Sequence, residues 1–283
     1  MKTMCASLTA SVLVLISAGT AHAAGLESAF LKPAAYSATQ GQTVAVRWTT
    51  GNAVQAKEAA WPTEQIGWLF VRAAGSQENR ENVGPRDASS DFIEFSAAKP
   101  GVALVGLDTK PRDQSWPVGE LQDFLRRVLT PDGYKVFEAQ SKEKAELKVR
   151  RYESAKTLVR VAAADGKPAT PSSVAQSKTG QMVEIRAMTD PTLVPVGGDL
   201  PVKTYVEYDT IKQQKVLATC VATGKTREIL CDQSGFATIR IDSTGEWRVE
   251  FHAYRKPRED ENVDGVLYSA TLTFEVTRTE GGK

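Results

Sequence analysis

Alternating apolar and polar residues along much of the chain predict half-buried β-strands. The segment 266–277 is the clearest case, because an apolar side chain occupies every second position, which is the period of a strand. These apolar positions are Val266, Tyr268, Ala270, Leu272, Phe274 and Val276. Segment 246–255 follows the same pattern and places His252 on the face opposite Trp247 and Phe251.

Further strands are predicted where short apolar runs lie between turn residues. They cover residues 43–50, 66–72, 92–95, 102–107, 156–162, 182–187, 202–208 and 236–241. One region has a different period. Leu121, Phe124, Leu125 and Val128 recur at helical spacing and predict a helix within 118–129.

A charged stretch at 134–154 is expected to continue the helical region with mostly solvated side chains. Residues 73–90 are polar and are expected to form a loop.

The polar segment 164–180 is rich in Pro, Ser, Thr and Gly, and it is predicted to be a linker. The expected fold is therefore mainly β, with two immunoglobulin-like β-sandwich domains. The first covers 24–163 and carries a helical insertion at about 117–154. The second covers 181–278, and a short tail at 279–283 follows.

The first 23 residues resemble a secretory signal peptide. Lys2 is their only charge, an apolar run extends from about Met4 to Ala18, and Ala21-His22-Ala23 matches a cleavage pattern. Spanning a bilayer takes roughly 20 apolar residues, so this run is too short for an anchor, and no later segment qualifies. We expect export to the periplasm and cleavage after Ala23, with cleavage after Ala21 as the alternative.

Removal of this leader changes the charge and the reactive residues. The formal net charge of +1 becomes zero without Lys2, which gives no electrostatic reason to expect nucleic acid as a partner. Two cysteines remain, Cys220 and Cys231, and a pair in an oxidising compartment most often forms a disulfide.

The stretch between the cysteines is expected to fold back near Lys225-Thr226, which would place Cys220 opposite Cys231. A metal pair would need more ligands than a single histidine supplies. A redox pair usually has C-x-x-C spacing, and Thr219 breaks the glycine pattern of a nucleotide-binding loop. The sequence therefore predicts a disulfide.

No group of residues predicts catalysis. Ser96 to Lys99 and Ser141 to Lys144 match S-x-x-K, and Lys178-Thr179-Gly180 matches K-T-G, but the S-D-N element of penicillin-recognising enzymes is absent. A serine nucleophile needs an adjacent desolvated base. Ser96 lies at a strand end before Pro100, and Ser141 lies in a highly charged stretch where a lysine stays solvated. We expect a non-catalytic protein, with a hydrolase as the alternative from another class.

The order of short motifs in the second half is similar to a known family. These motifs are Met182–Ile185, Asp190-Pro191, Val196–Val202, Asp232-x-x-Gly235, Gly245-x-Trp247-x-Val249 with His252, and Leu267–Phe274; Gly41–Val44 and Arg151–Lys156 fit upstream. The chain thereby resembles exported bacterial proteins of unknown function, often labelled periplasmic components of cobalt or nickel uptake systems. The resemblance implies nickel or cobalt as ligand and a membrane transporter or envelope component as partner.

Members of that family usually carry histidines near the mature N-terminus. Residues 26–33 contain none here, unless His22 survives processing. His252 fits the family's position, and Glu250 and Tyr254 share its strand face, so these three residues are the candidate ligand-binding site. One histidine cannot form a conventional metal site alone, and we assign no metal ligands.

The predicted function is a non-catalytic periplasmic binding or accessory protein linked to divalent metal uptake. The alternative is a module that binds an envelope glycan or surface polymer through the loop tryptophans Trp61 and Trp116.

Overall fold

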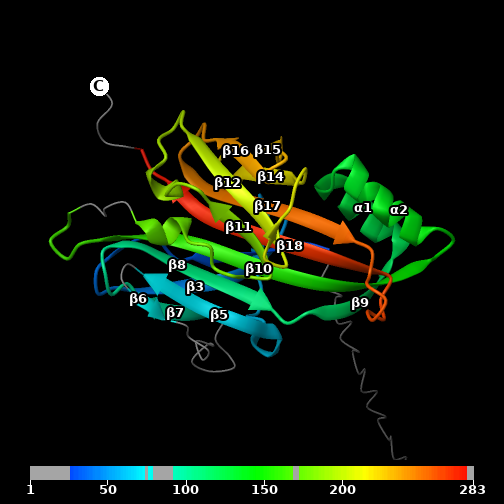
Figure 1. Cartoon of the computed structure of the whole chain (residues 1–283). Helices are drawn as coiled ribbons and strands as arrows, with labels where there is room; N and C mark the ends of the chain where they lie inside the picture. The colour runs from blue at the N-terminus through cyan, green and yellow to red at the C-terminus, as the bar shows by residue number, and fades with distance from the viewer. Residues whose placement is uncertain (1–25, 74–75, 79–91, 168–171, 279–283) are drawn as a thin grey trace, which may run out of the picture.

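The structure of the chain is a computed structural model that describes residues 26–73, 76–78, 92–167 and 172–278 (Figure 1). The predicted leader at 1–23, the tail at 279–283 and most of the predicted loop at 73–90 lie outside these residues. The described chain is mainly β, as the sequence predicts. None of its helices combines the length and apolar character that crossing a bilayer requires.

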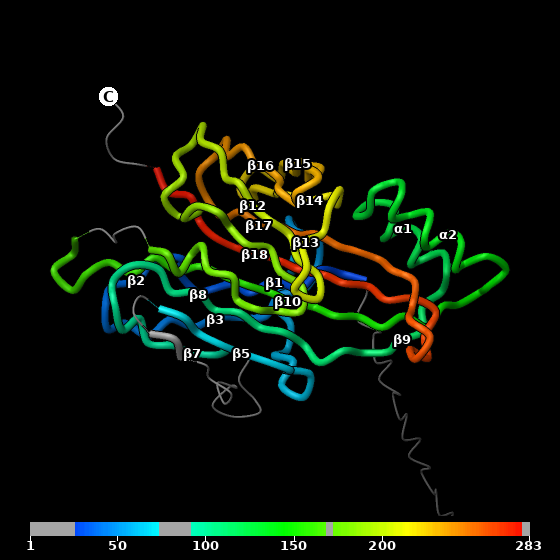
Figure 2. Tube along the Cα trace, viewed as in Figure 1, coloured from blue at the N-terminus to red at the C-terminus, as the bar shows by residue number. Residues whose placement is uncertain are grey.

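One long mixed sheet runs through the molecule (Figures 1 and 2). Its strands are, in order, β15 (Lys225–Leu230), β14 (Lys215–Cys220), β17 (Gly245–Arg255), β18 (Gly265–Val276), β10 (Glu146–Ala162), β8 (Gly101–Thr109), β5 (Ile66–Ala73) and β6 (Ser76–Glu78). Two further strands, β2 (Ser37–Thr39) and β9 (Arg112–Pro117), also pair with β10. β10 joins the halves of the chain, because it pairs antiparallel with β8 and parallel with β18.

Two small sheets cover opposite faces of the long one. The first contains β1 (Ser28–Pro33), β3 (Thr43–Gly51), β4 (Lys57–Glu58) and β7 (Phe92–Ser96). The second contains β11 (Val183–Ala187), β12 (Asp199–Val206), β13 (Asp209–Thr210) and β16 (Phe236–Arg240). Successive side chains of β8 point to opposite faces of the long sheet and so reach both cores. Val102 and Leu104 join the core under the second small sheet, and Ala103 and Val105 join the core under the first.

Two helices lie beside the β1–β3–β4–β7 sheet on the same face of the long sheet. They are α1 (Val118–Val128) and α2 (Pro131–Ser141), and short 3-10 turns occur at Thr63–Gln65, Ser173–Gln176 and Pro191–Leu193. Thr130 caps α2, because its hydroxyl accepts from the Gly133 amide at 3.3 Å. The apolar faces of the helices pack on Leu147, Leu217 and Leu267 of the long sheet.

The prediction of a helical region that extends to residue 154 is wrong at its end. Residues 146–155 belong to β10, a strand of 17 residues. Leu147 and Val149 alternate with charged side chains there, and Arg150 forms an ion pair with Asp113 of β9 at 2.6 Å. The strand period of this segment is hard to recognise in the sequence, because its many charged residues look like a solvated helix face. In the structure these charged side chains pair with those of the neighbouring strand.

The predicted disulfide is also wrong in this structure, in which Cys220 and Cys231 are buried free thiols. The turn of the β14–β15 hairpin comes before Lys225, so that Cys220 faces Lys225. The Cys231 amide donates to the Gln214 carbonyl at the other end of the hairpin, at 2.9 Å. The cysteines are therefore roughly 20 Å apart along the strand at about 3.3 Å per residue, whereas a disulfide needs Cα atoms within about 7 Å.

The end of the predicted linker packs against the long sheet. Ala175 and Thr179 are buried. Lys156 of β10 forms a buried ion pair with Glu184 of β11 at 2.8 Å, and the Thr179 amide donates to the same Glu184 oxygen at 2.8 Å. Gln181 Nε2 donates to Asp108 of β8 at 2.9 Å. These contacts fasten the start of the second half to the long sheet.

Candidate functional site

A strip of buried polar residues crosses the long sheet between the helices and the β1–β3–β4–β7 sheet. Its members come from β10, β17 and β18: Arg151, Glu153, Arg248, Glu250, His252, Ser269, Thr271 and Thr273. β1 lies over this strip, and two of its carbonyls accept hydrogen bonds from threonines. Thr271 donates to Ala29 and Thr273 to Leu31, each at 2.6 Å.

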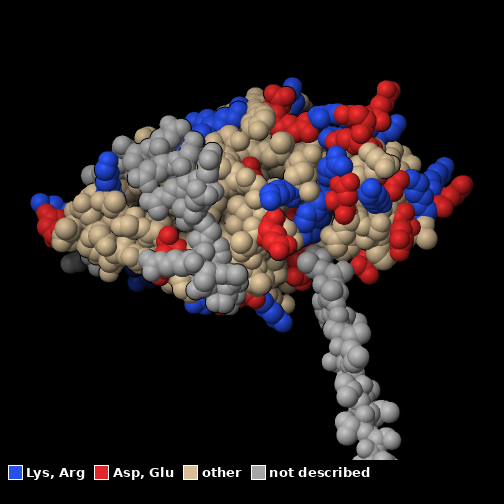
Figure 3. Space-filling view, turned by 90° about the horizontal axis from the view of Figure 1, so that it is seen from below, with Lys and Arg blue, Asp and Glu red and all other residues tan. Residues whose placement is uncertain are grey.

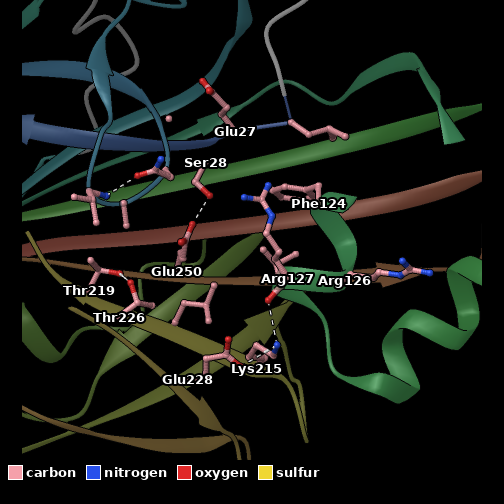
Figure 4. A pocket seen from close by; sticks show the side chains of 17 residues that line it. Glu27, Ser28, Phe124, Arg126, Arg127, Lys215, Thr219, Thr226, Glu228 and Glu250 are labelled. Atoms are coloured by element: carbon pink, nitrogen blue, oxygen red, sulfur yellow. Dashed lines mark hydrogen bonds and ion pairs between the residues drawn. The ribbon is translucent and has the colours of Figure 1, made fainter. Parts of the chain in front are cut away.

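A cavity of about 520 Å³ opens at the end of β1, beside this strip (Figure 4). Its walls come from five separate parts of the chain: the start of β1, residues 51–54 at the end of β3, the end of α1, the β14–β15 hairpin, and β17. Small-molecule sites typically measure roughly 300–1,000 Å³, so this cavity has the size of a ligand-binding pocket.

Ser28 and Glu250 form the polar floor of the cavity. The Ser28 hydroxyl donates to Glu250 Oε2. His252 lies behind them and is 1% exposed; its Nε2 is 3.3 Å from Ser28 Oγ and 3.4 Å from Glu250 Oε2. Strand register places His252 opposite Ser269, whose hydroxyl lies 3.0 Å from Nδ1. Phe124 of α1 packs edge-on against the imidazole.

Arg127 extends from α1 over this floor. Its Nε donates to the Asp123 carbonyl at 3.3 Å, and its guanidinium carbon is 6.0 Å from the centre of the Phe124 ring. Figure 4 shows the end of the side chain directed toward Ser28 and Glu250. Its terminal amino groups make no hydrogen bond or ion pair to any residue in the described part of the chain.

The other basic residues near the cavity are already paired. Lys215 forms an ion pair with Glu228 at 3.1 Å, and its ammonium group also donates to the Arg127 carbonyl at 3.1 Å. Arg126 also lines the cavity, but it donates to the Tyr134 hydroxyl at 2.9 Å, and Figure 4 shows its side chain directed away from Ser28 and Glu250. On the face shown in Figure 3, acidic and basic side chains are interspersed.

Of the three predicted ligand-binding residues, only Glu250 lines the cavity. Tyr254 packs under α2 against Phe137, with ring centres 5.8 Å apart. Burial raises the pKa of the Tyr254 hydroxyl well above its usual value. Gly265 makes room for this ring, because a Cβ there would meet the Tyr254 hydroxyl oxygen at 1.9 Å.

The two loop tryptophans are buried: Trp61 is 6% and Trp116 is 2% exposed. They pack in the cores beneath the β1–β3–β4–β7 sheet and the helices, respectively. Neither is available to stack on a sugar.

The side chains at the cavity do not fit a conventional nickel, cobalt or zinc site. Over the described residues, no group of three or more His, Cys, Asp or Glu side chains is placed to hold a metal ion. His252 and Glu250 supply two ligand atoms, whereas structural and catalytic sites of these metals use three or four protein ligands.

The arrangement of Ser28, His252 and Glu250 does not match a catalytic triad. A triad places the serine and the carboxylate on opposite nitrogens of the imidazole. Here both lie near Nε2, and Ser269 lies near Nδ1. The Ser28 hydroxyl also donates its hydrogen bond to the Glu250 carboxylate and not to the imidazole, so the histidine is not arranged to activate the serine.

Sequence reasoning missed Ser28 and Arg127. Neither lies in a motif, and they reach the cavity from β1 and α1, elements that meet only in the folded chain. The sequence held one local signal for Ser28: it lies within residues 26–33, the region where the resembled family usually carries histidine.

The fold and the cavity define a β-rich protein with a pocket of small-molecule size between its layers. The chain belongs to the family known as DUF4198, a domain of unknown function, whose sequence profile matches residues 27–254. No curated protein matches the chain significantly. Among solved structures, the Escherichia coli adhesin FdeC matches with 11% identity and a TM-score of 0.21, over 90% of this chain and 98% of that one.

Proposed function

We propose that this chain is an exported, non-catalytic binding protein that holds a small polar ligand in the cavity above Ser28 and Glu250. The cavity itself is the observation that supports this most directly. Five separate segments wall it, and its floor consists of buried polar groups, a combination typical of ligand sites.

The proposed setting is the periplasm, where the chain would assist cobalt or nickel uptake together with a membrane transporter or envelope component. The sequence resemblance supports this setting. Because no group of three or more His, Cys, Asp or Glu side chains in the described part of the chain is placed to hold a metal ion, we expect the bare ions to bind weakly. We also propose that the fold consists of two immunoglobulin-like β-sandwich domains that share the long sheet.

A glycan-binding function has less support, because both loop tryptophans are buried. We therefore rank the cavity ahead of any surface site.

Thermal unfolding in the presence of candidate ligands tests the proposal. The panel contains nickel and cobalt ions, amino acids, small carboxylates and oligosaccharides. A ligand at a hundredfold excess over its Kd adds about 2.7 kcal/mol to the free energy of unfolding, so it raises the melting temperature by several degrees. Thr226→Trp should abolish the effect, because Thr226 is exposed and lines the cavity, and an indole there fills it.

The matched control is Thr238→Trp on β16, an exposed strand threonine that does not line the cavity. It should respond as the wild type does. A panel without any stabilising compound, or equal responses from both tryptophan variants, would overturn the proposal. Calorimetric titration with nickel or cobalt chloride tests the metal link; micromolar binding that His252→Ala leaves intact would contradict a role for this site.

A further inference from the structure

Two opposite charges face the cavity without neutralising each other. The Arg127 guanidinium points toward the floor, and the Glu250 carboxylate forms part of the floor (Figure 4). No ion pair joins them in the part of the chain that the structure describes. Unlike Lys215 and Glu228, which pair at 3.1 Å, these two groups are held apart on different elements, α1 and β17.

Their surroundings keep the two groups in place. Glu250 is 7% exposed and is fixed by the Ser28 hydroxyl and the neighbouring His252 imidazole. Arg127 is tethered through Nε to its own helix and lies over the Phe124 ring. Its terminal amino groups can therefore donate two parallel hydrogen bonds to a carboxylate, the geometry that arginine favours.

Part of the cavity wall is apolar. Phe124, Val128 and Leu217 line the cavity and are buried. A ligand that satisfies both charges would lay a hydrocarbon side chain against this wall and remove it from water.

Building on the proposed function, we infer that the ligand is a zwitterion of the amino-acid type. Its carboxylate pairs with Arg127, its ammonium group with Glu250, and its side chain packs on Phe124 and Leu217. A molecule with both charges leaves neither protein group desolvated and unpaired, whereas a simple anion or cation leaves one of them uncompensated.

Calorimetric titration with the common L-amino acids provides the test. The amino acid that binds best is then compared with its amide, which lacks the carboxylate, and with its deaminated acid, which lacks the ammonium group. We expect each derivative to bind at least about tenfold more weakly, since hydrogen bonds between charged groups are stronger than those between neutral ones.

Variants assign the two ends of the ligand. Arg127→Gln should weaken the amino acid and the deaminated acid about tenfold and leave the amide unchanged. Glu250→Gln should weaken the amino acid and the amide and leave the deaminated acid unchanged. Arg240→Gln, a change at an exposed arginine of β16 that does not line the cavity, should have no effect.

Two outcomes separate this inference from the proposed function. If no amino acid binds, or if another compound binds in a manner sensitive to Thr226→Trp but not to Arg127→Gln, the zwitterion inference is wrong and the binding function stands. If nothing in the full panel depends on Thr226, the binding function itself fails.

Discussion

At the scale of single residues, Ser28 connects the N-terminal strand to the polar strip. Its hydroxyl is the hydrogen-bond donor to Glu250, a carboxylate that is 7% exposed. Ser28→Ala removes this donor and leaves the buried oxygen undersatisfied. We expect a loss of about 1–3 kcal/mol in the free energy of unfolding, measured by urea denaturation.

The control for this change is Ser28→Thr, which keeps the hydroxyl and should recover most of the stability. Equal stability of the alanine variant and the wild type would show that Glu250 finds another donor.

Asp108 gives a second prediction at this scale, on pH. Burial raises the pKa of its carboxyl to about 6, against hydrogen bonds from Ser154, Met182 and Gln181 that lower it. The unfolded chain titrates near the ordinary value of about 3.9. Between these values the folded state binds a proton that the unfolded state lacks, so this contribution to stability falls as pH rises from about 4 to 6 and stays constant above.

Urea denaturation of the wild type and Asp108→Asn at several pH values isolates this contribution. The free-energy difference, wild type minus variant, should decrease by about 2 kcal/mol between pH 4.5 and pH 7. A difference that does not change with pH would mean that Asp108 titrates normally.

Residue-level reasoning succeeded where chemistry is local to a strand and failed where it depends on distant elements. Glu250 was found because it shares a strand face with His252. The burial of His252 could not be predicted, because the cover comes from β1 and Phe124, far away in sequence. Arg127 looks like any exposed arginine near the end of a helix, and only the position of α1 over β17 gives it a role.

At the scale of elements, hydrophobic period predicted most strands and α1, because those segments have one apolar face. It failed for β1, whose polar Ser28 and short length hide the pattern. It also failed for the start of β10, where paired charges alternate with apolar residues. Hydrophobic period also does not fix strand register. The sequence pattern predicts the turn of the β14–β15 hairpin too late along the chain, and it therefore assigns the wrong cross-strand partner to each cysteine.

The β14–β15 hairpin carries a prediction on thiol chemistry. Cys220 and Cys231 are buried, and burial raises the pKa of the Cys231 thiol, which lowers the fraction of reactive thiolate. In a chain that starts at residue 24, Ellman's reagent should react slowly with the folded protein. It should react with both thiols after guanidinium unfolding without reductant.

If the unfolded sample shows no reactive thiol, Cys220 and Cys231 form the disulfide that the sequence predicts. The β14–β15 hairpin would then need a different register. Intact mass before and after alkylation gives an independent count.

At the scale of the whole molecule, one sheet contains strands from both halves of the chain. The buried Lys156–Glu184 pair adds a contact between this sheet and β11. Glu184→Gln leaves an ammonium group that is 3% exposed without its counter-charge. We expect a loss of about 3–5 kcal/mol in the free energy of unfolding.

A double-mutant cycle checks the coupling. Lys156→Met with Glu184→Gln should be more stable than Glu184→Gln alone, because the unpaired cation is gone. Additive effects of the two substitutions would show that the pair does not couple the layers.

The position of β10 has a consequence for how the protein is made. Its parallel partner β18 is synthesised roughly a hundred residues after it, since Val149 pairs with Gly265 and Thr157 with Thr273. During translation the central strand therefore has an open edge, and pairings between segments so distant form slowly. If the predicted leader directs the nascent chain to a translocation channel, this delay keeps the chain unfolded, and able to pass through, until β18 has been synthesised.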